Sequence, residues 1–175
     1  MDAIVSVTRD WGIGHNGSLV VDNRADMRRF VALTCGGKRP KDAAPGEVLG
    51  TVIMGRKTFE SFPGGALKAR RNLVITRNES FTAPGAEVVH SVSEALAAVA
   101  DSDPDTVWLI GGESIYRQLL PYCQRVHVTY NDITVPVDAS FPNLDADPSW
   151  LLAEEELGGI TDAGVSFTYR TYLHK

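Results

Sequence analysis

The sequence predicts an α/β fold, in which a mostly parallel sheet carries an antiparallel edge formed by the last strands of the chain. Up to residue 120, short apolar segments rich in β-branched residues alternate with segments that have helical spacing or helical caps. Two of the apolar segments run through glycine directly into a helix. After residue 120 only strand-like segments follow, which is typical of antiparallel strands added at one edge of a sheet.

The composition is that of an ordinary globular protein. Of the 175 residues, 43% are hydrophobic and 22% are charged, and we expect one domain over residues 1–175. No apolar run approaches a membrane span, and we expect no signal peptide. The net charge of −5 argues against binding to nucleic acid. Cys35 and Cys123 form no CxxC motif and the histidines have no metal-ligand spacing, so we expect a reduced, cytoplasmic protein without a metal site.

The first elements predicted are a strand and a helix separated by irregular chain. Residues 3–8 are short, apolar and β-branched, as in a buried strand. Residues 9–24 contain three glycines and lead into a helix at 25–34, where apolar residues recur on one face. The segment 35–47 is polar and rich in glycine and proline, which predicts a surface loop.

The later elements are predicted in the same way. Further strands are expected at 51–54, 72–76, 87–89, 106–110 and 125–131, and further helices at 56–62, 91–100 and 112–120. Ser91 and Glu94 form a capping box at the start of one of these helices, and Pro121 stops another. Residues 150–157 and 165–173 are expected to form the antiparallel pair.

Two segments, 51–58 and 106–113, each run from an apolar strand through glycine into a helix. Glycine lets the backbone turn sharply and come close to a ligand. The free N–H groups at the start of the following helix favour an anion. The first segment adds two adjacent cations, Arg56 and Lys57. The sequence therefore predicts that a phosphorylated cofactor is held across the end of the sheet.

A third glycine-rich segment has a misleading pattern. Gly12, Gly14 and Gly17 match the G-x-G-x-x-G dinucleotide motif, which requires a helix at that point and an acid about twenty positions later. Here an extended apolar run, 18–21, follows instead, and Gly-Gly-Lys stands where the acid is required. We therefore interpret the match as chance, and the segment 9–24 as a candidate lid.

Several segments, taken in order, resemble those of dihydrofolate reductase. They are 3–7, 11–19, 26–30, 52–58, 67–72 and 110–116, and the likeness continues at 126–129 and 138–142. The resemblance implies a single domain with a mostly parallel eight-stranded sheet and helices on both faces. It also implies NADPH as the hydride donor and 7,8-dihydrofolate as the substrate, with hydride transfer to C6 and protonation at N5 giving tetrahydrofolate.

The resemblance assigns catalysis to Asp26, with Leu19 and Val21 in the loop before it. An ionised carboxylate accepts two parallel N–H bonds, which matches the amino-pyrimidine edge of a pterin ring. The family's acid at this place also supports protonation of N5. Thr129 is implied to support the acid through a hydrogen bond. On the residues alone, the alternative for Asp26 is an exposed acid that compensates the helix dipole.

Arg70 occupies the place where the family's arginine binds the glutamate α-carboxylate of folate. A guanidinium group binds a carboxylate bidentately, and the alternative is a solvated basic surface over residues 68–71. The other substrate-binding residues implied by the resemblance are Ile4, Val5, Phe30, Phe62, Leu67, Ile110, Tyr116 and Thr129. The alternative for the apolar members and for Tyr116 is ordinary packing.

For the cofactor, the resemblance implies contacts from both glycine junctions and from nearby strand ends. The residues are Ser6, Ile13, Gly14, Gly55, Arg56, Lys57, Thr58, Ile75, Thr76, Arg77, Gly111, Gly112, Glu113, Ser114, Ile115 and Tyr116. Gly111 and Gly112 correspond to a strained Gly-Gly peptide beside the nicotinamide and pyrophosphate. Arg77 is implied to bind the adenosine 2′-phosphate, which favours NADPH over NADH; the alternative is an unremarkable surface arginine.

The family pattern is broken just before Asp26. The family has two prolines and a tryptophan in this stretch, and this chain has Val20, Val21 and Arg24 in their places. Valine lacks the indole N–H that holds a water near the proton path, and the loss of proline loosens the loop. We expect a slower proton or closure step, or altered antifolate sensitivity. We also expect Arg24 to pair with Asp26 and to lower its pKa.

Two alternatives stay open at this point. A reductase of another pterin or of a pyrimidinone would share the glycine junctions but would not need Asp26 or Arg70. A non-catalytic NADPH-binding module would bind the cofactor without turnover. In each case we expect a monomer that binds a small molecule, with neither a nucleic-acid nor a membrane partner.

Overall fold

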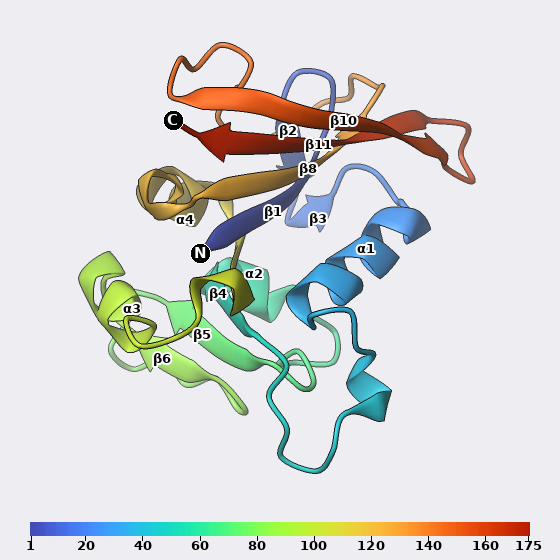
Figure 1. The fold of residues 1–175 in the computed structure, drawn as a ribbon. Coiled ribbons are helices and arrows are strands. Elements are labelled where there is room, and N and C mark those ends of the chain that lie inside the picture. Colours follow the sequence, from blue (N-terminus) through green and yellow to red (C-terminus); the bar gives the residue numbers. More distant parts are fainter.

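The computed structural model describes residues 1–175 and places eight strands in one sheet, in the order β10-β11-β8-β1-β7-β4-β5-β6 (Figure 1). The strands are β1 (Asp2–Val7), β4 (Thr51–Gly55), β5 (Arg71–Ile75), β6 (Glu87–Val89), β7 (Val107–Gly111), β8 (Arg125–Asn131), β10 (Trp150–Ile160) and β11 (Ser166–His174). The strands from β8 to β6 are parallel to their neighbours, whereas β11 and β10 are antiparallel at one edge. The predicted sheet is therefore confirmed.

Helices cover both faces of this sheet, as predicted. They are α1 (Arg24–Thr34), α2 (Arg56–Glu60), α3 (Val92–Ala98) and α4 (Glu113–Leu119), with 3-10 turns at η1 (Pro40–Asp42), η2 (Pro104–Thr106) and η3 (Leu120–Tyr122). Successive residues of a strand point to opposite faces. On β4, Ile53 packs in the core under α3 and α4, whereas Val52 and Met54 pack in the core under α1 and α2. Burial on both faces explains the continuous apolar sequence of these strands.

The segment 9–24, predicted to be irregular, contributes two strands to a second, three-stranded sheet. Strand β2 (Gly12–His15) pairs with β3 (Ser18–Leu19) and with β9 (Ala139–Ser140). Asn16 and Gly17 join β2 to β3 with φ angles of 50° and 77°. That is the backbone of a two-residue hairpin turn, for which Asn-Gly is a strong sequence signal. The prediction of irregular chain was therefore wrong here, while the rejection of a dinucleotide motif is confirmed because a strand replaces the helix.

The other predicted elements are confirmed, with shifts at their ends. Helix α2 ends at Glu60, two residues early, and β10 continues beyond the predicted end to Ile160. The predicted capping box on α3 forms only in part. Ser91 Oγ accepts a hydrogen bond from the Glu94 amide at 3.0 Å, but the Glu94 carboxylate accepts from the amide of His90 rather than from that of Ser91.

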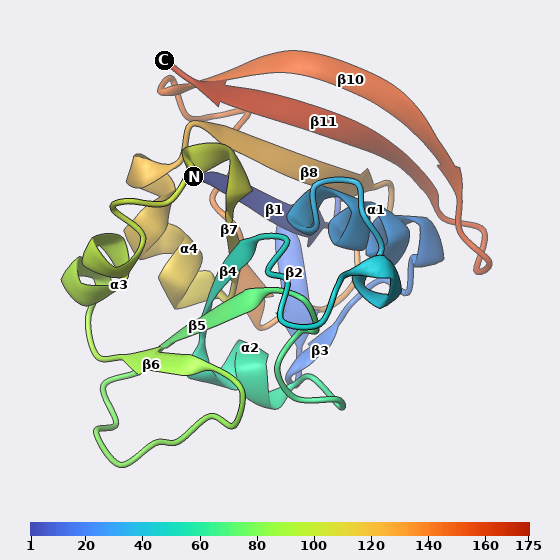
Figure 2. The ribbon, with the colours of Figure 1, turned by 60° about the horizontal axis from the view of Figure 1, so that its bottom comes forward.

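The loop between α1 and β4 lies on the surface, as predicted, and is tied down by its own side chains. Lys38 Nζ lies 2.7 Å from Glu47 Oε2, and Arg39 pairs with Asp42. The Glu47 carboxylate also accepts a hydrogen bond from the Ala44 amide at 2.7 Å. Figure 2 shows this loop beneath the C-terminal end of α1. The loop therefore forms a fixed wall beside that helix.

Two further expectations concern the chain as a whole. Cys35 and Cys123 are both buried and are free thiols. None of the helices combines the length and the apolar character that crossing a bilayer requires.

Candidate active site

The two glycine junctions lie side by side at the carboxyl ends of β4 and β7. Met54 is in register with Gly111 across the two strands. A Cβ atom on Gly55 would lie 3.0 Å from the Ile115 side chain and 3.8 Å from the Gly112 nitrogen. Larger side chains would therefore push the two turns apart. The peptide between Gly111 and Gly112 is cis. The structure thus brings together the two segments that the sequence singled out.

The cations near these junctions differ in how they are paired. Arg56 begins α2, and its Nη1 lies 2.9 Å from both carboxylate oxygens of Glu60. Lys57 is exposed and forms no ion pair, and the same holds for Arg77, two residues beyond the end of β5. Unpaired cations at the edge of a glycine cradle suit an anionic ligand. Lys57 and Arg77 are therefore better placed than Arg56 to meet a phosphate group.

The other predicted cofactor residues are distributed over the same end of the sheet. Ile13, Ile75, Ile115 and Tyr116 are buried, Ser6, Gly14, Thr58, Thr76 and Glu113 are partly buried, and Ser114 is exposed. A Cβ atom on Gly112 would lie 3.3 Å from Thr58 Oγ1, so this hydroxyl reaches the second junction. The Tyr116 hydroxyl donates to the Ile4 carbonyl at 2.7 Å. Contacts of these residues with a nucleotide stay a prediction.

Asp26 is buried in the first turn of α1, against β8. Asn23 caps the helix, since its side-chain oxygen accepts hydrogen bonds from the amides of Ala25 and Asp26 at 3.0 and 3.1 Å. Thr129 Oγ1 donates to Asp26 Oδ1 at 2.6 Å. Only 8% of Asp26 is exposed. The hydrogen bond predicted for Thr129 is therefore present, and Asp26 is not the exposed helix-start acid of the alternative interpretation.

Burial raises the pKa of Asp26 above its ordinary value, because the ionised carboxylate loses solvation. The hydrogen bond from Thr129 and the positive charge of Arg29 act in the opposite direction. Arg24, which was expected to pair with Asp26, is exposed and lies 3.3 Å from Asp162. That prediction was wrong because residues two apart on a helix point to nearly opposite sides.

A hollow of about 160 Å³ opens beside Asp26. Its lining consists of Leu19, Val21, Asp22, Asn23, Asp26 and Met27. The structure thus brings the loop residues Leu19 and Val21 to the buried acid. Leu19 is 63% exposed, so an apolar surface faces outward at the entrance. A carboxyl group under such a hollow can orient a ring that carries N–H donors and can hold a proton near it.

Five predicted substrate-binding residues share one face of the sheet. Ile4, Phe30, Phe62, Leu67 and Ile110 belong to the apolar cluster under α1 and α2. Val5 follows Ile4 on β1, and its side chain therefore points to the opposite face, where it joins the other core. Val5 can reach the face of Ile4 only through its backbone.

Arg70 lies near the far end of α1 from Asp26. Its Nη1 donates to Thr34 Oγ1 at 3.0 Å, its Nε donates to the Lys68 carbonyl at 3.1 Å, and its guanidinium carbon lies 5.8 Å from the centre of the Phe30 ring. Burial lowers the pKa of Arg70. No carboxylate pairs with this half-buried cation, which fits a ligand-binding arginine better than a solvated basic surface.

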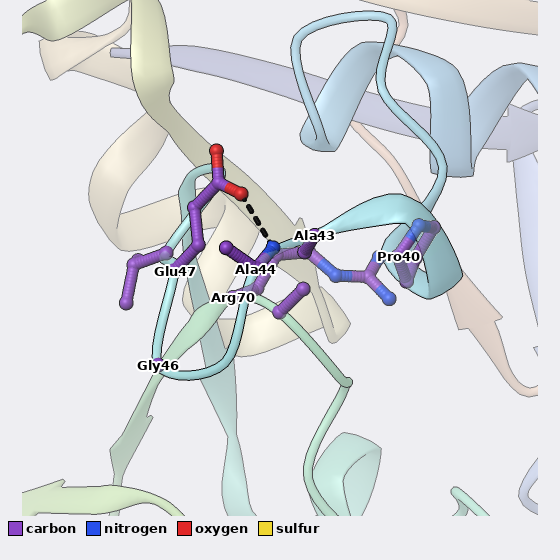
Figure 3. Close-up of a pocket in the computed structure, with 8 residues that line it drawn as sticks. Pro40, Ala43, Ala44, Gly46, Glu47 and Arg70 are labelled. Carbon is purple, nitrogen blue, oxygen red and sulfur yellow. Dashed lines mark hydrogen bonds between the residues drawn. The ribbon is translucent and has the colours of Figure 1, made fainter.

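A second hollow, of about 350 Å³, adjoins Arg70 on the side of the surface loop (Figure 3). It is lined by Pro40, Ala43, Ala44, Gly46, Glu47, Val48, Ala69 and Arg70. Figure 3 shows the Arg70 side chain running along the loop toward Pro40. The loop between α1 and β4, which the sequence predicts only as a surface segment, therefore forms the wall next to this arginine.

Two residues near Asp26 were not predicted from the sequence. Asn23 is the helix cap, and an asparagine just before an apolar helical pattern is a recognised signal for that position. Arg29 lies one turn after Asp26 on α1. Its spacing of three residues from Asp26 was the available sequence signal, because residues three apart lie on the same side of a helix. Its guanidinium carbon lies 4.3 Å from the centre of the Tyr169 ring.

Tyr116 lies between the glycine junctions and β1, because its ring is the nearest neighbour of a Cβ placed on Gly111 and its hydroxyl donates to the Ile4 carbonyl. The negative charge of Asp26 contributes to the raised pKa of Tyr116, so the tyrosine is also near the acid. A buried acid on one side and a glycine cradle with free cations on the other define an α/β oxidoreductase site that can hold a phosphorylated nucleotide.

The comparisons with known proteins agree with this class. A family model described as dihydrofolate reductase matches residues 1–174.

Individual relatives cover most of the chain. Dihydrofolate reductase from Neisseria gonorrhoeae is 40% identical over 124 residues, which are 71% of this chain and 75% of that protein. Dihydrofolate reductase type 3 from Salmonella typhimurium is 36% identical over 137 residues, 75% of each chain. A solved structure of dihydrofolate reductase from Enterococcus faecalis, complexed with NADP(H) and RAB-propyl, aligns with a TM-score of 0.80 at 28% identity and covers 99% of this chain and 95% of that one. This chain belongs to the dihydrofolate reductase family and is an NADPH-dependent oxidoreductase.

Proposed function

We propose that this protein reduces 7,8-dihydrofolate to tetrahydrofolate with NADPH, using Asp26 at one end of α1 and Arg70 at the other. The observation that carries the proposal is this pair. Arg70 binds Thr34, eight residues after Asp26, and eight residues of helix span about 12 Å. The substrate should therefore have a ring with N–H donors at one end and a carboxylate roughly a nanometre away. Dihydrofolate has this form, whereas an untailed pterin or a pyrimidinone does not.

Asp26 binds and orients the ring. Its Oδ1 already accepts the hydrogen bond from Thr129, which fixes the plane of the carboxylate, and both oxygens keep lone pairs for the substrate. An ionised carboxylate then accepts the paired N–H donors of the amino-pyrimidine edge. The raised pKa of Asp26 makes proton uptake easier than for an exposed aspartate, so the same group supports protonation of N5.

The glycine junctions fit NADPH, because they form a cradle that any Cβ would fill and because Lys57 and Arg77 are unpaired cations at its edge. Bound NADPH supplies the hydride, and the chain itself needs no nucleophile. Lys57 and Thr58 would meet the phosphate groups, with Arg56 beside them. Arg77 would meet the adenosine 2′-phosphate and so would favour NADPH over NADH. The segment 9–24, with Leu19 and Val21, covers the ring and excludes water.

The wider setting follows from the same proposal. The enzyme acts as a monomer in the cytoplasm on a small-molecule substrate and has no nucleic-acid partner. The alternative of a non-catalytic NADPH-binding module is less favoured, because such a module would not need the buried acid Asp26.

The pair of end groups predicts a substrate-dependent effect of Arg70→Leu. The variant should raise KM for dihydrofolate by about 10-fold or more, the cost of losing a charge-assisted pair of hydrogen bonds. It should leave the kinetics of a dihydropterin without the glutamate tail unchanged, because that compound has no carboxylate. Steady-state oxidation of NADPH with each compound measures both effects.

The neighbouring Arg71 offers a matched control, since it binds Glu87 at 2.8 Å on the opposite side of the strand end. Arg71→Leu should not distinguish the two compounds. An equal loss with both compounds in Arg70→Leu would show that Arg70 is structural and would remove the case for a tailed substrate.

A further inference from the structure

Arg29 is a half-buried cation on the same side of α1 as Asp26, three residues further along the helix. Its guanidinium carbon lies 4.3 Å from the centre of the Tyr169 ring. Its Nη1 is buried and has no hydrogen-bond partner in the protein. No carboxylate lies within ion-pair distance of it. A cation with a buried, unsatisfied donor is costly to the fold, so its position calls for a role beyond packing.

The strands under α1 explain how Arg29 is held. Thr129 of β8 lies directly opposite Tyr169 of β11, and Tyr169 lies opposite Glu156 of β10. Directly opposite residues project from the same face of an antiparallel pair. Thr129, Tyr169 and Glu156 therefore form a row across the sheet. Helix α1 lies over this row, so that Asp26 contacts Thr129 on β8 and Arg29 contacts Tyr169 on the neighbouring strand β11.

This arrangement places a fixed positive charge between two negative ones. The charge of Arg29 interacts with the carboxylates of both Asp26 and Glu156. The cation–π contact with Tyr169 fixes the guanidinium without neutralising it. Glu156 is exposed and screened by solvent, whereas Asp26 is buried. The field of Arg29 therefore acts mainly on Asp26.

We propose that Arg29 is a positioning residue of the reductase, whose charge, held by Tyr169, keeps Asp26 ionised until the substrate ring is bound. The proposal rests on the proposed role of Asp26. Burial disfavours the ionised form of Asp26, and a protonated carboxyl could not accept both N–H donors of the ring. Arg29 opposes that effect without occupying either oxygen, which a direct ion pair would do.

The other groups around Asp26 do not supply this charge. Tyr116 on α4 is buried, and burial raises its pKa, so it is neutral. Asp22 lines the same hollow and is itself negative. Arg24 is directed to Asp162 in solvent. Thr129 donates a hydrogen bond but carries no charge. Among the groups on the elements packed around Asp26, Arg29 is the cation whose charge lowers the pKa of this acid.

The test is the titration of Asp26 in variants of Arg29. Reduction consumes a proton, so the rate falls as pH rises through the midpoint set by Asp26 and the bound ring. In Arg29→Met this midpoint should move to higher pH. Arg29→Lys keeps the charge and should remain close to the unmodified protein. The side-chain carboxyl resonance of Asp26, assigned by its loss in Asp26→Asn, should show the same upward shift without substrate.

Two further variants separate charge from packing. Arg28→Met removes an exposed cation from the same helix and should leave both titrations unchanged. Tyr169→Leu keeps the charge of Arg29 but removes the ring that holds the guanidinium. This variant should shift the midpoint in the same direction as Arg29→Met, but by less. It also tests the proposal if Arg29→Met does not fold.

Coincident titrations in the unmodified protein and the Arg29 and Tyr169 variants would overturn the proposal, as would an equal shift in Arg28→Met. Failure of the proposed function would look different. In that case the unmodified protein would bind NADPH but would not oxidise it with dihydrofolate, whatever the carboxyl resonance of Asp26 does in the Arg29 variants.

Discussion

Asp26 is held 8% exposed against Thr129, in surroundings that disfavour its charged form. Because its pKa in the folded protein is raised above the ordinary value of 3.8, the folded state binds this proton more tightly than the unfolded chain. Its contribution to the free energy of unfolding is therefore fully present below about pH 3.8 and declines as pH rises through the folded-state pKa. The residue needed for the reaction thus lowers stability at neutral pH.

This conflict predicts that Asp26→Asn stabilises the protein. Asparagine keeps an oxygen to accept the Thr129 hydrogen bond and removes the buried charge. We expect the free energy of unfolding near neutral pH to rise by on the order of 1 kcal/mol, with no gain in acid, where Asp26 is already neutral. Urea unfolding at both pH values measures the effect, and the exposed Asp22→Asn is the control. A lower stability of Asp26→Asn at neutral pH would contradict this assignment.

Single residues show where sequence reasoning succeeds and fails. Asp26 and Arg70 were identified because their neighbours occur in the order of a known family, and the structure gives both the burial that binding residues need. Arg24 was assigned to Asp26 because it is near in sequence, but the helix turns it away to Asp162. Arg29 was missed because its partner Tyr169 lies far along the chain, and only the folded sheet brings them together.

At the level of elements, the end of β7 is the part of the cofactor cradle with the least freedom. Gly111 has a φ of 119°, which side chains rarely adopt, and a Cβ there would lie 3.0 Å from the Tyr116 ring. We expect Gly111→Ala to lower the free energy of unfolding by about 1–3 kcal/mol and to weaken NADPH binding. Urea unfolding and a fluorescence titration with NADPH measure the two effects.

Gly64→Ala is the control for this substitution, because a Cβ on Gly64 meets no atom within 4 Å and its φ is not restrictive. It should change neither stability nor NADPH affinity measurably. NADPH affinity in Gly111→Ala equal to that of the unmodified protein would show that the cofactor does not depend on the backbone at this junction.

The elements themselves were largely predictable, for a physical reason. Strands such as β4 and β7 are buried on both faces and therefore have short, continuous apolar sequences rich in β-branched residues, which favour strands. The hairpin of β2 and β3 was missed because its strands are only four and two residues long, and exposed in part. Its register depends on the Asn16-Gly17 turn rather than on apolar periodicity.

For the molecule as a whole, the strand order determines which parts of the chain meet at the site. The C-terminal pair, β10 and β11, joins the sheet beside β8 rather than beside the edge strand β6. This places Tyr169 next to Thr129 and so next to α1. The sequence predicts an antiparallel pair but contains no local signal for its neighbour, because pairing between distant strands is settled only by the packed core. The contribution of the tail to the site follows from the structure alone.

The most direct measurement is the oxidation of NADPH with 7,8-dihydrofolate by the unmodified protein and by Asp26→Asn, together with NADPH titrations of both. The assignment predicts turnover by the unmodified protein and a fall in kcat/KM of about 100-fold or more in the variant, with unchanged NADPH affinity. Equal turnover by both proteins would contradict the role of Asp26. Tight NADPH binding without any turnover of dihydrofolate by the unmodified protein would contradict the proposed reaction.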